Sequence, residues 1–516
     1  MNADAKGGTQ PTPDPPPDAV AVATTRTVDL APGAARREHD LLGERDVPAN
    51  AYWGIHTLRA VENFPITGVP VGHFPEFVRA LALVKQAAAR ANKRLGYLSA
   101  EKADAIVRAC DLIAREGRYH EQFVVDAVQG GAGTSTNMNA NEVVANVALE
   151  LIGRDKGDYT ALHPNDDVNM SQSTNDAYPT ALRLAIIFAA TPLIQALDEL
   201  AFAFKAKAVE FGDVLKIGRT QLQDAVPMTL GQEFDAFFTT IKEDEARLKE
   251  GAALFREVNL GATAIGTGIN ADPRYAALAV EELARAAHET LVPATNLIEA
   301  TSDMGAFVFF SGVLKRVAVK VSKICNDLRL LSSGPRAGFG EIRLPAVQAG
   351  SSIMPGKVNP VIPEVVNQVA FMVVGYDLTV TLCAEGGQLQ LNAFEPTIGY
   401  CILSSLRHLT AAVTTLTNRC VLDIEADRER CRELVENSIG LVTALGPTLG
   451  YEISSRIAKR ALAEKRKVSD IVLEENLLTR EQLESLLRIE AMTGPSRAKS
   501  PASFAPAAPR PARQVP

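Results

Sequence analysis

The segment Gly350–Pro360, with the sequence GSSIMPGKVNP, combines two hydroxyls, one cation and one amide within eleven residues. Its two glycines and two prolines predict a loop, because neither residue suits the interior of a helix or a strand. Lys357 supplies a positive charge that suits a carboxylate or a phosphate. A free serine hydroxyl is a weak base and nucleophile, so Ser351 or Ser352 needs surroundings that stabilise its alkoxide. An ordinary connecting loop would explain the same composition.

Two glycine-rich segments depart from nucleotide-binding motifs. A P-loop has four residues between its glycines and a Ser or Thr after its lysine. Here five residues separate Gly350 from Gly356, and Val358 follows Lys357. The segment Gly261–Gly268 has the wrong glycine spacing for a dinucleotide fingerprint and follows a helical pattern instead of a strand. Both departures argue against a nucleotide enzyme.

Three further segments collect hydroxyl and amide side chains where helices are predicted to begin or end: Gly130–Asn139, Ser171–Asp176 and Gly218–Asp224. The N–H groups and the dipole at a helix N-terminus favour an anion. Helix capping explains each segment when it is taken alone. Together with Lys357 and Asn359, the segments describe a cationic, hydroxyl-lined pocket without a metal, which suits a small dicarboxylate.

Long helices must position these segments. Apolar residues repeat at alternating intervals of three and four over residues 307–331, and Gly334-Pro335 follows as a stop signal. A second helix is predicted from Thr229, its N-cap, to about Val258. Further helices are predicted at Tyr178–Phe211, Pro363–Cys383 and Thr397–Asn418. Strand-like alternation is scarce, so the pattern predicts a mostly α fold built on a helix bundle. The apolar faces are too wide for the bundle of one subunit, which predicts an oligomer.

Composition narrows the class of protein. The 516 residues suffice for about two to four domains. A net charge of −8 argues against nucleic acid as the main partner. The six cysteines include no CxxC pair and the histidines form no HExxH pattern, which favours a reduced, cytoplasmic enzyme without a structural metal. The chain has no run of about 18 apolar residues and no apolar signal core, so neither a membrane span nor a secretory signal is predicted.

Both ends of the chain are predicted to be disordered. Residues 1–37 and 494–516 are rich in Pro and Ala, and the second segment is also basic. Neither has the apolar periodicity that would offset the entropy lost on ordering. A basic tail could tether the chain to acidic surfaces, but the composition favours a solvated tail.

The four polar segments resemble, in their order along the chain, the active-site regions of the aspartase/fumarase superfamily. Gly350–Pro360 is similar to the signature loop of that family, and the likeness extends from about Glu38 to about Met492. Residues 220–227 resemble the aspartase branch, since Gln221 stands where fumarases usually carry histidine. The stretches 361–368 and 388–392 are also aspartase-like. One stretch, 163–169, is closer to a secondary site of fumarases, and we interpret it as peripheral.

The resemblance implies the architecture of the whole protein. It implies an amino-terminal domain over residues 38–174, a central helical bundle over 175–429 and a small carboxy-terminal domain over 430–493. Four bundles would pack into a homotetramer with a multi-helix core. Each active site would take its motifs from three subunits, so a folded monomer should be inactive.

The resemblance also implies a reaction, the reversible removal of ammonia from L-aspartate to give fumarate. Ser351 would be the general base that removes a proton from the carbon beside the β-carboxylate, and oriented donors would stabilise the resulting aci-carboxylate. Gln221 would bind by hydrogen bonds but cannot donate a positive charge. The other implied substrate-binding residues are Thr134, Ser173, Thr174 and Ser352 for the β-carboxylate, Lys357, Asn359 and Thr220 for the α-carboxylate, and Asn175, with Thr134 and Thr174, for the amino group.

No cofactor or metal site is implied, although some relatives are activated by a divalent cation such as Mg²⁺. Two alternatives compete with the ammonia-lyase interpretation. A class II fumarate hydratase would use the same proton abstraction on L-malate, but Gln221 and the stretch 361–368 argue against it. A catalytically silent scaffold would have no need of the intact Ser351, Lys357 and Asn359.

Overall fold

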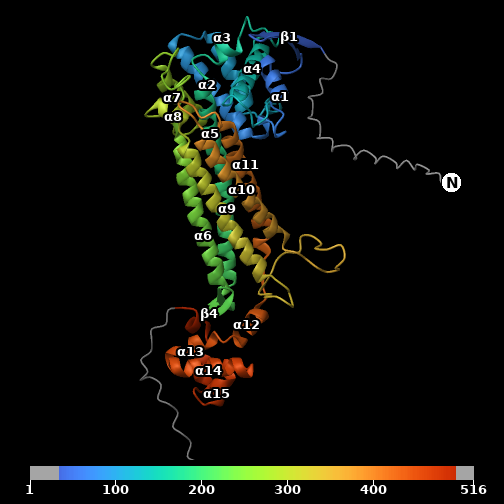
Figure 1. Cartoon of the computed structure of the whole chain (residues 1–516), viewed down its shortest axis with the longest axis vertical. Coiled ribbons are helices and arrows are strands. Elements are labelled where there is room, and N and C mark those ends of the chain that lie inside the picture. Colours follow the sequence, from blue (N-terminus) through green and yellow to red (C-terminus); the bar gives the residue numbers. More distant parts are fainter. Residues whose placement is uncertain (1–33, 495–516) are drawn as a thin grey trace, which may run out of the picture.

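The computed structural model describes residues 34–494, and helices dominate this part of the chain (Figure 1). The predicted mostly α fold is confirmed. Within the described range, every sheet has only two strands. Most of the two predicted disordered tails, 1–33 and 495–516, lies outside the described residues. Figure 1 shows an elongated subunit with helices gathered at an upper end, a long bundle in the middle and a small group of helices at the lower end.

Five long helices form the bundle. Their bounds are α5 (Thr174–Glu210), α6 (Leu230–Ala253), α9 (Gly305–Leu331), α10 (Val361–Glu385) and α11 (Glu395–Arg419). The predicted seam on α9 is confirmed, because the eight apolar residues at alternating intervals from Phe307 to Leu331 are all buried. Thr229 caps α6 as predicted, and its capping-box partner is Gln232.

Two helix ends differ from the prediction. The α-helix α6 ends at Ala253 and not near Val258, because a 3-10 helix over Leu254–Arg256 follows it and buries Phe255 against Phe307 and Phe310. Helix α5 begins four residues before the predicted Tyr178. Its proline at position 179 has no N–H for the carbonyl of Asn175 one turn earlier. Asn259 Nδ2 donates to that carbonyl instead, at 3.0 Å, so the helix continues through the proline.

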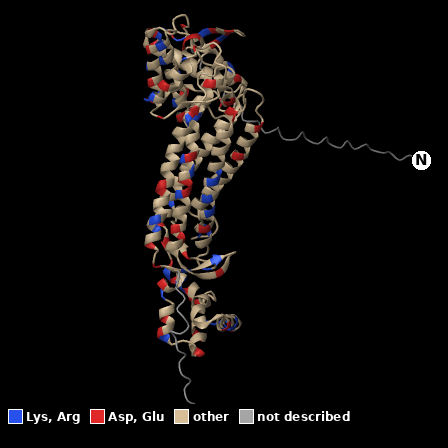
Figure 2. Ribbon diagram, turned by 90° about the vertical axis from the view of Figure 1, so that its left-hand side faces the viewer, with Lys and Arg blue, Asp and Glu red and all other residues tan. Residues whose placement is uncertain are grey.

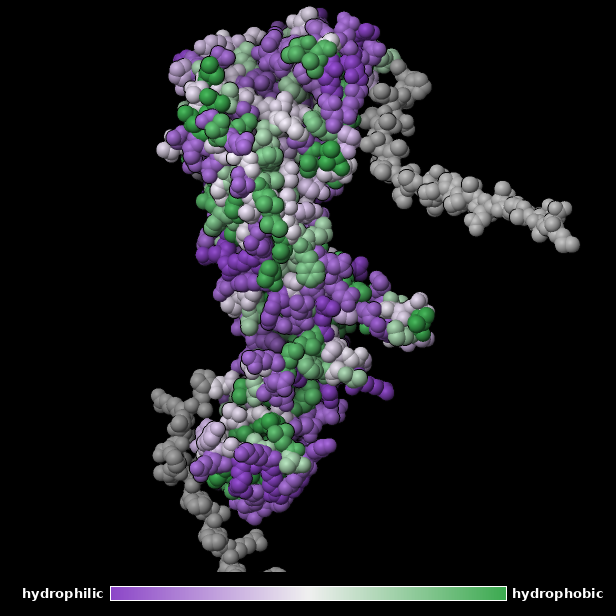
Figure 3. Space-filling model, viewed as in Figure 1, coloured by the Kyte–Doolittle hydropathy of each residue, from purple (hydrophilic) through white to green (hydrophobic). Residues whose placement is uncertain are grey.

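By length and composition, α5 and α10 each contain an 18-residue window apolar enough to cross a membrane. In α5, 72% of that window is buried inside the subunit, as expected for the core helix of a bundle. In α10 only 33% is buried. The exposed residues there include Phe371, Leu378 and Leu382, which are 66%, 62% and 62% exposed. Apolar surface is visible along the bundle in Figure 3. The wide apolar face predicted from the sequence is therefore present on α10.

The upper end contains a hairpin and several shorter helices. Their bounds are β1 (Ala35–Asp40), β2 (Gly43–Pro48), α1 (Ile55–Asn63), α2 (Pro75–Leu95), α3 (Ala100–Ala114), α4 (Thr134–Leu151), β5 (Glu257–Val258), α7 (Tyr275–Ala287), β6 (Val292–Pro293) and α8 (Leu297–Ser302). Strand β1 begins inside the segment 1–37 that was predicted to be disordered, so that boundary is wrong.

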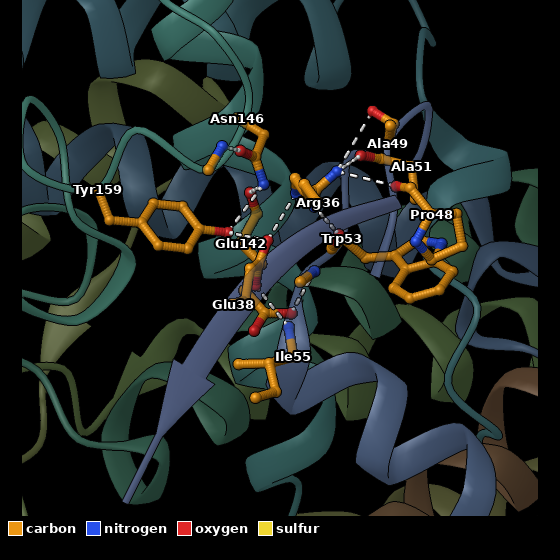
Figure 4. A network of polar contacts seen from close by, with 12 residues as sticks. Arg36, Glu38, Pro48, Ala49, Ala51, Trp53, Ile55, Glu142, Asn146 and Tyr159 are labelled. Atoms are coloured by element: carbon orange, nitrogen blue, oxygen red, sulfur yellow. Dashed lines mark hydrogen bonds and ion pairs between the residues drawn. The ribbon is translucent and has the colours of Figure 1, made fainter. Parts of the chain in front are cut away.

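Polar contacts explain why β1 is ordered (Figure 4). Arg36 Nη1 donates to the carbonyl of Ala51 at 2.7 Å, and Glu38 accepts from the Ile55 N–H at 2.8 Å. The buried carboxylate of Glu142, on α4, accepts from the N–H groups of Gly54 and His56, both at 2.8 Å. These bonds join the hairpin to α1 and α4. These polar bonds hold β1 in place, although its sequence lacks the apolar periodicity on which order was judged.

The lower end carries a second hairpin and the carboxy-terminal helices. Their bounds are β3 (Leu215–Thr220), β4 (Gln223–Thr229), β7 (Ile342–Arg343), β8 (Glu425–Ala426), α12 (Arg428–Asn437), α13 (Leu441–Leu449), α14 (Tyr451–Glu464), α15 (Val468–Glu474), α16 (Arg480–Leu486) and α17 (Ile489–Met492). The long segment between α9 and α10 also lies at this end, and it projects from the bundle in Figure 1. All six cysteines are free, as predicted.

Candidate active site

At the upper end, the start of α5 presents three of the predicted site residues. Ser173 caps the helix, and its Oγ accepts from the Asn175 N–H at 3.2 Å. Thr174 Oγ1 accepts from Asn137 Nδ2 at 3.3 Å. The hydroxyl oxygens of Ser173 and Thr174 each accept a hydrogen bond, so the proton of each hydroxyl remains available for donation to an anion. The helix N-terminus adds its own preference for negative charge.

Asn175 is oriented by the glycine-rich segment Gly261–Gly268, which sequence reasoning had considered only as a failed nucleotide motif. Asn175 Nδ2 donates to the carbonyl of Ala264 at 2.7 Å. No donor among the described residues reaches its Oδ1, which can therefore accept from an ammonium group. The adjacent Asp176 carboxylate accepts from the N–H groups of Gly261 and Thr263, at 2.9 and 3.0 Å, and fastens the segment to α5.

The glycines of this segment were the signal that could have revealed its role. Gly266 has a φ of +92°, and a Cβ there would lie 2.3 Å from the backbone of Ile298. A side chain at this position would push the segment away from α8. The tight turn therefore holds the carbonyl that orients Asn175.

A buried lysine lies behind the start of α5, and the sequence analysis missed it. Lys85 Nζ donates to Asn137 Oδ1, Asn169 Oδ1 and Gln172 Oε1, at 2.6, 3.1 and 2.9 Å. Burial lowers its pKa to about 7, and the Asp176 carboxylate only partly offsets that effect. Asn169 belongs to the stretch that we had interpreted as peripheral, yet it contacts the residues that support Thr174.

Thr134 is the first residue of α4, and its hydroxyl is exposed. It lines a pocket together with His56, Arg59, Ser135 and Met138, among others. Thr134 Oγ1 donates to the carbonyl of Gly131 at 2.7 Å. In this arrangement the hydroxyl can accept from an ammonium group, and it must turn to donate to a carboxylate.

At the lower end, Thr220 and Gln221 lie at the tip of the β3–β4 hairpin and are exposed. Gln221 and Leu222 form the turn with φ values of +54° and +62°. Such a turn usually takes Asn or Gly, because other residues are strained in the left-handed region. The turn holds Gln221 away from the hairpin body and free to meet a ligand.

The signature loop also lies at the lower end and is closed on itself. Gly350 donates its N–H to the carbonyl of Lys357 at 2.8 Å, and Asn359 Nδ2 donates to the carbonyl of Gly350 at 2.9 Å. Ser351 Oγ accepts from the N–H groups of Ile353 and Met354, at 3.2 and 3.1 Å. Two donors aimed at one hydroxyl oxygen stabilise negative charge on it. Ser352 is exposed on the same loop.

Lys357 and Asn359 line a second pocket with Arg329 and Glu364, between the end of α9 and the start of α10. Arg329 also donates to Asn367 Oδ1 at 3.1 Å. Two cationic side chains, Lys357 and Arg329, therefore line this pocket. Over residues 34–494, no group of three or more His, Cys, Asp and Glu side chains could hold a metal ion.

One subunit does not bring the predicted residues together. Helix α5 has 37 residues, with Thr174 at its upper end and Thr220 just beyond its lower end. At about 1.5 Å per residue, it separates them by roughly 55 Å. Within a single chain, Thr134, Ser173, Thr174 and Asn175 form one group, and Thr220, Gln221, Ser351, Ser352, Lys357 and Asn359 lie at the opposite end of the bundle.

Comparisons with known proteins identify the family of the chain. A family model described as "Lyase" matches residues 43–375, and one described as "Fumarase C C-terminus" matches residues 441–494. Aspartate ammonia-lyase of Pseudomonas fluorescens is 64% identical over 461 residues, covering 89% of this chain and 96% of the relative. Aspartate ammonia-lyase of Escherichia coli K12 is 54% identical over the same shares of the two chains.

Solved structures of related lyases are also similar to this chain. A fumarate lyase:delta crystallin from Brucella melitensis, bound to cobalt, has a TM-score of 0.87 and 61% identity, covering 90% of this chain and all of that one. The class II fumarase of Schistosoma mansoni has a TM-score of 0.84 at 34% identity, covering 88% of this chain and 98% of that one. The chain therefore belongs to the aspartase/fumarase superfamily of lyases.

Proposed function

We propose that the protein is an ammonia-lyase that converts L-aspartate to fumarate and ammonia, reversibly and without a cofactor. The observation that carries the proposal is the identity of 54–64% to several aspartate ammonia-lyases over about nine-tenths of the chain. Gln221 in place of a histidine supports it against the hydratase alternative. Activation by a divalent cation such as Mg²⁺ is part of the proposal, and so is a cytoplasmic location.

In this proposal Ser351 is the base. It removes a proton from the carbon beside the β-carboxylate, and the electron pair moves into that carboxylate to give the aci-carboxylate. The two N–H groups directed at Ser351 Oγ, with Lys357 nearby in the loop, favour its alkoxide. The electron pair then returns, a carbon–carbon double bond forms, and the carbon–nitrogen bond breaks with loss of ammonia. Oriented donors lower the barrier because negative charge grows on the β-carboxylate in the first step.

The contacts at the upper end fit the roles proposed for its residues. Ser173 and Thr174 can donate to the β-carboxylate, and the exposed Ser352 would join them from another chain. Asn175 Oδ1 can accept from the amino group, and Thr134 can assist with its hydroxyl oxygen. Lys357, Asn359 and Thr220 would bind the α-carboxylate, and Gln221 would bind the substrate by hydrogen bonds.

The two separated groups of residues can act together only across subunits. We therefore propose a homotetramer whose active sites are shared between chains, assembled through the apolar face of α10. The three-domain division at residues 38–174, 175–429 and 430–493 remains part of this proposal. Lys, Arg, Asp and Glu are interspersed along the bundle in Figure 2, which supports neither nucleic acid nor a membrane as partner.

Fumarate formation, followed by ultraviolet absorbance with L-aspartate or L-malate in parallel, tests the proposal. Turnover of L-aspartate alone is the expected result. Turnover of L-malate alone would identify a fumarate hydratase, and inactivity of a confirmed tetramer on both would favour the scaffold alternative.

A further inference from the structure

Glu341 lies at the lower end of the bundle, between α9 and the signature loop, and it is 0% exposed. Its Oε1 accepts from Arg219 Nη1 at 2.9 Å, and its Oε2 lies 3.2 Å from Lys216 Nζ. Both basic residues belong to β3, which leads into Thr220 and Gln221. A buried carboxylate therefore contacts the strand that carries two candidate substrate-binding residues.

The pairing of β3 with β4 is irregular between the two basic residues that contact Glu341. Residues three apart on a regular strand point to opposite faces. The register between β3 and β4 shifts between Ile217 and Arg219, where Gly218 of β3 faces two residues of β4, Ala225 and Val226, so the bulge is in β4. A Cβ at Gly218 would lie 2.9 Å from the carbonyl oxygen of Val226, so a side chain there would disturb the bulge.

Glu341 is itself held firmly. Its N–H donates to the carbonyl of Leu331, at the end of α9, and its carbonyl accepts from the N–H of Asp427, both at 2.9 Å. Asp427 caps α12. The Arg219 guanidinium also lies 4.0 Å from the centre of the Phe339 ring. Arg219 is thus fixed from two sides immediately before the strained turn at Gln221 and Leu222.

We propose that Glu341 is a positioning residue for the reaction. Through Arg219 and Lys216, it holds the hairpin so that Thr220 meets the α-carboxylate of the substrate and Gln221 binds the substrate by hydrogen bonds. The inference rests on the proposed function of the site. A left-handed turn of non-glycine residues persists only where its surroundings hold it, and the Arg219–Glu341 ion pair lies two residues before Gln221.

Glu341→Gln tests the inference, because it keeps the size of the side chain and removes its charge. The α-carboxylate is bound in both the ground state and the transition state, so we expect KM for L-aspartate to rise about tenfold while kcat stays within about threefold. Arg219→Lys should raise KM similarly, since lysine lacks the planar guanidinium. The double variant should show no further rise.

Glu233→Gln is the matched control. It removes the carboxylate that lies 2.6 Å from Lys216 Nζ but does not touch the Arg219–Glu341 pair, so KM should not change. An unchanged KM in tetrameric Glu341→Gln would overturn the inference, as would an equal rise in Glu233→Gln. If Glu341→Gln does not assemble, Arg219→Lys decides by the same criterion. Inactivity of the unaltered protein on L-aspartate would instead reject the proposed function.

Discussion

The two ends of the bundle hold the two parts of the candidate site in different ways. At the upper end, Thr174 and Asn175 are half-buried at a helix terminus and bonded to Asn137 and Asn259, which are themselves buried. At the lower end, Gln221 and most of the signature loop are exposed on turns. The upper part is preorganised. The lower part has contacts mainly within its own hairpin or loop and completes its surroundings only against another chain and the substrate.

The strongest test of the lower end is Ser351→Ala. Loss of the proposed base should reduce kcat by about 10²–10⁴-fold, the usual contribution of general base catalysis. Fumarate absorbance measures turnover, and light scattering verifies that the tetramer remains. Substantial deamination by a tetrameric variant would reject Ser351 as the base.

The apolar face of α10 is tested by Leu378→Glu. Placing a charge on this exposed face should dissociate the assembly and thereby abolish activity, because neither end of a subunit is complete alone. Analytical ultracentrifugation reports the size of the complex. Leu462→Glu on α14 is the matched control, since Leu462 is 61% exposed but lies in the small lower group of helices. An active monomer would contradict the shared site.

At the upper end, Thr174→Ala should lower kcat by about 10²–10³-fold, as does the loss of one donor to a developing charge. Mixing these subunits with Ser351→Ala subunits sharpens the comparison. If the two ends belong to different chains, some sites in mixed tetramers receive both intact residues and activity returns. A mixture no more active than its components would mean that each site comes from one chain.

The last prediction concerns stability and not catalysis, at the upper end of the bundle, where charges are buried. Burial raises the pKa of Glu395 to about 8, although the nearby Arg183 opposes the shift. Between its ordinary pKa of 4.5 and about 8, the folded chain holds a proton that the unfolded chain releases, so the stability that Glu395 contributes is lost as pH rises through this window.

Glu395→Gln should remove this dependence. Each pKa unit corresponds to about 1.4 kcal/mol, so the expected effect on the free energy of unfolding is of the order of a few kcal/mol. The measurement is thermal unfolding at pH 5 and at pH 8. Between these two pH values, the Tm of the variant should fall less than the Tm of the unaltered protein. An equal fall of Tm in both proteins would mean that a group other than Glu395 causes the pH dependence of stability.

Local patterns in the sequence were enough to predict the bundle. The three-and-four spacing on α9 and the cap at Thr229 are short-range signals, and both are present in the structure.

The start of α5 was misplaced because the group that bonds to the carbonyl left free by Pro179 is Asn259, far along the chain. Lys85 looks like an ordinary helix lysine, since its three amide partners belong to two distant segments. Glu341 was missed for the same reason. Contacts between distant segments carry no local signal.

The length of α5 has a further consequence for how the protein behaves in solution. A site assembled from separate chains obeys mass action, so the fraction of working sites depends on total protein concentration. On dilution below the dissociation constant of the assembly, specific activity should fall while each chain keeps its helices. Catalytic measurements on this protein are therefore also measurements of a binding equilibrium.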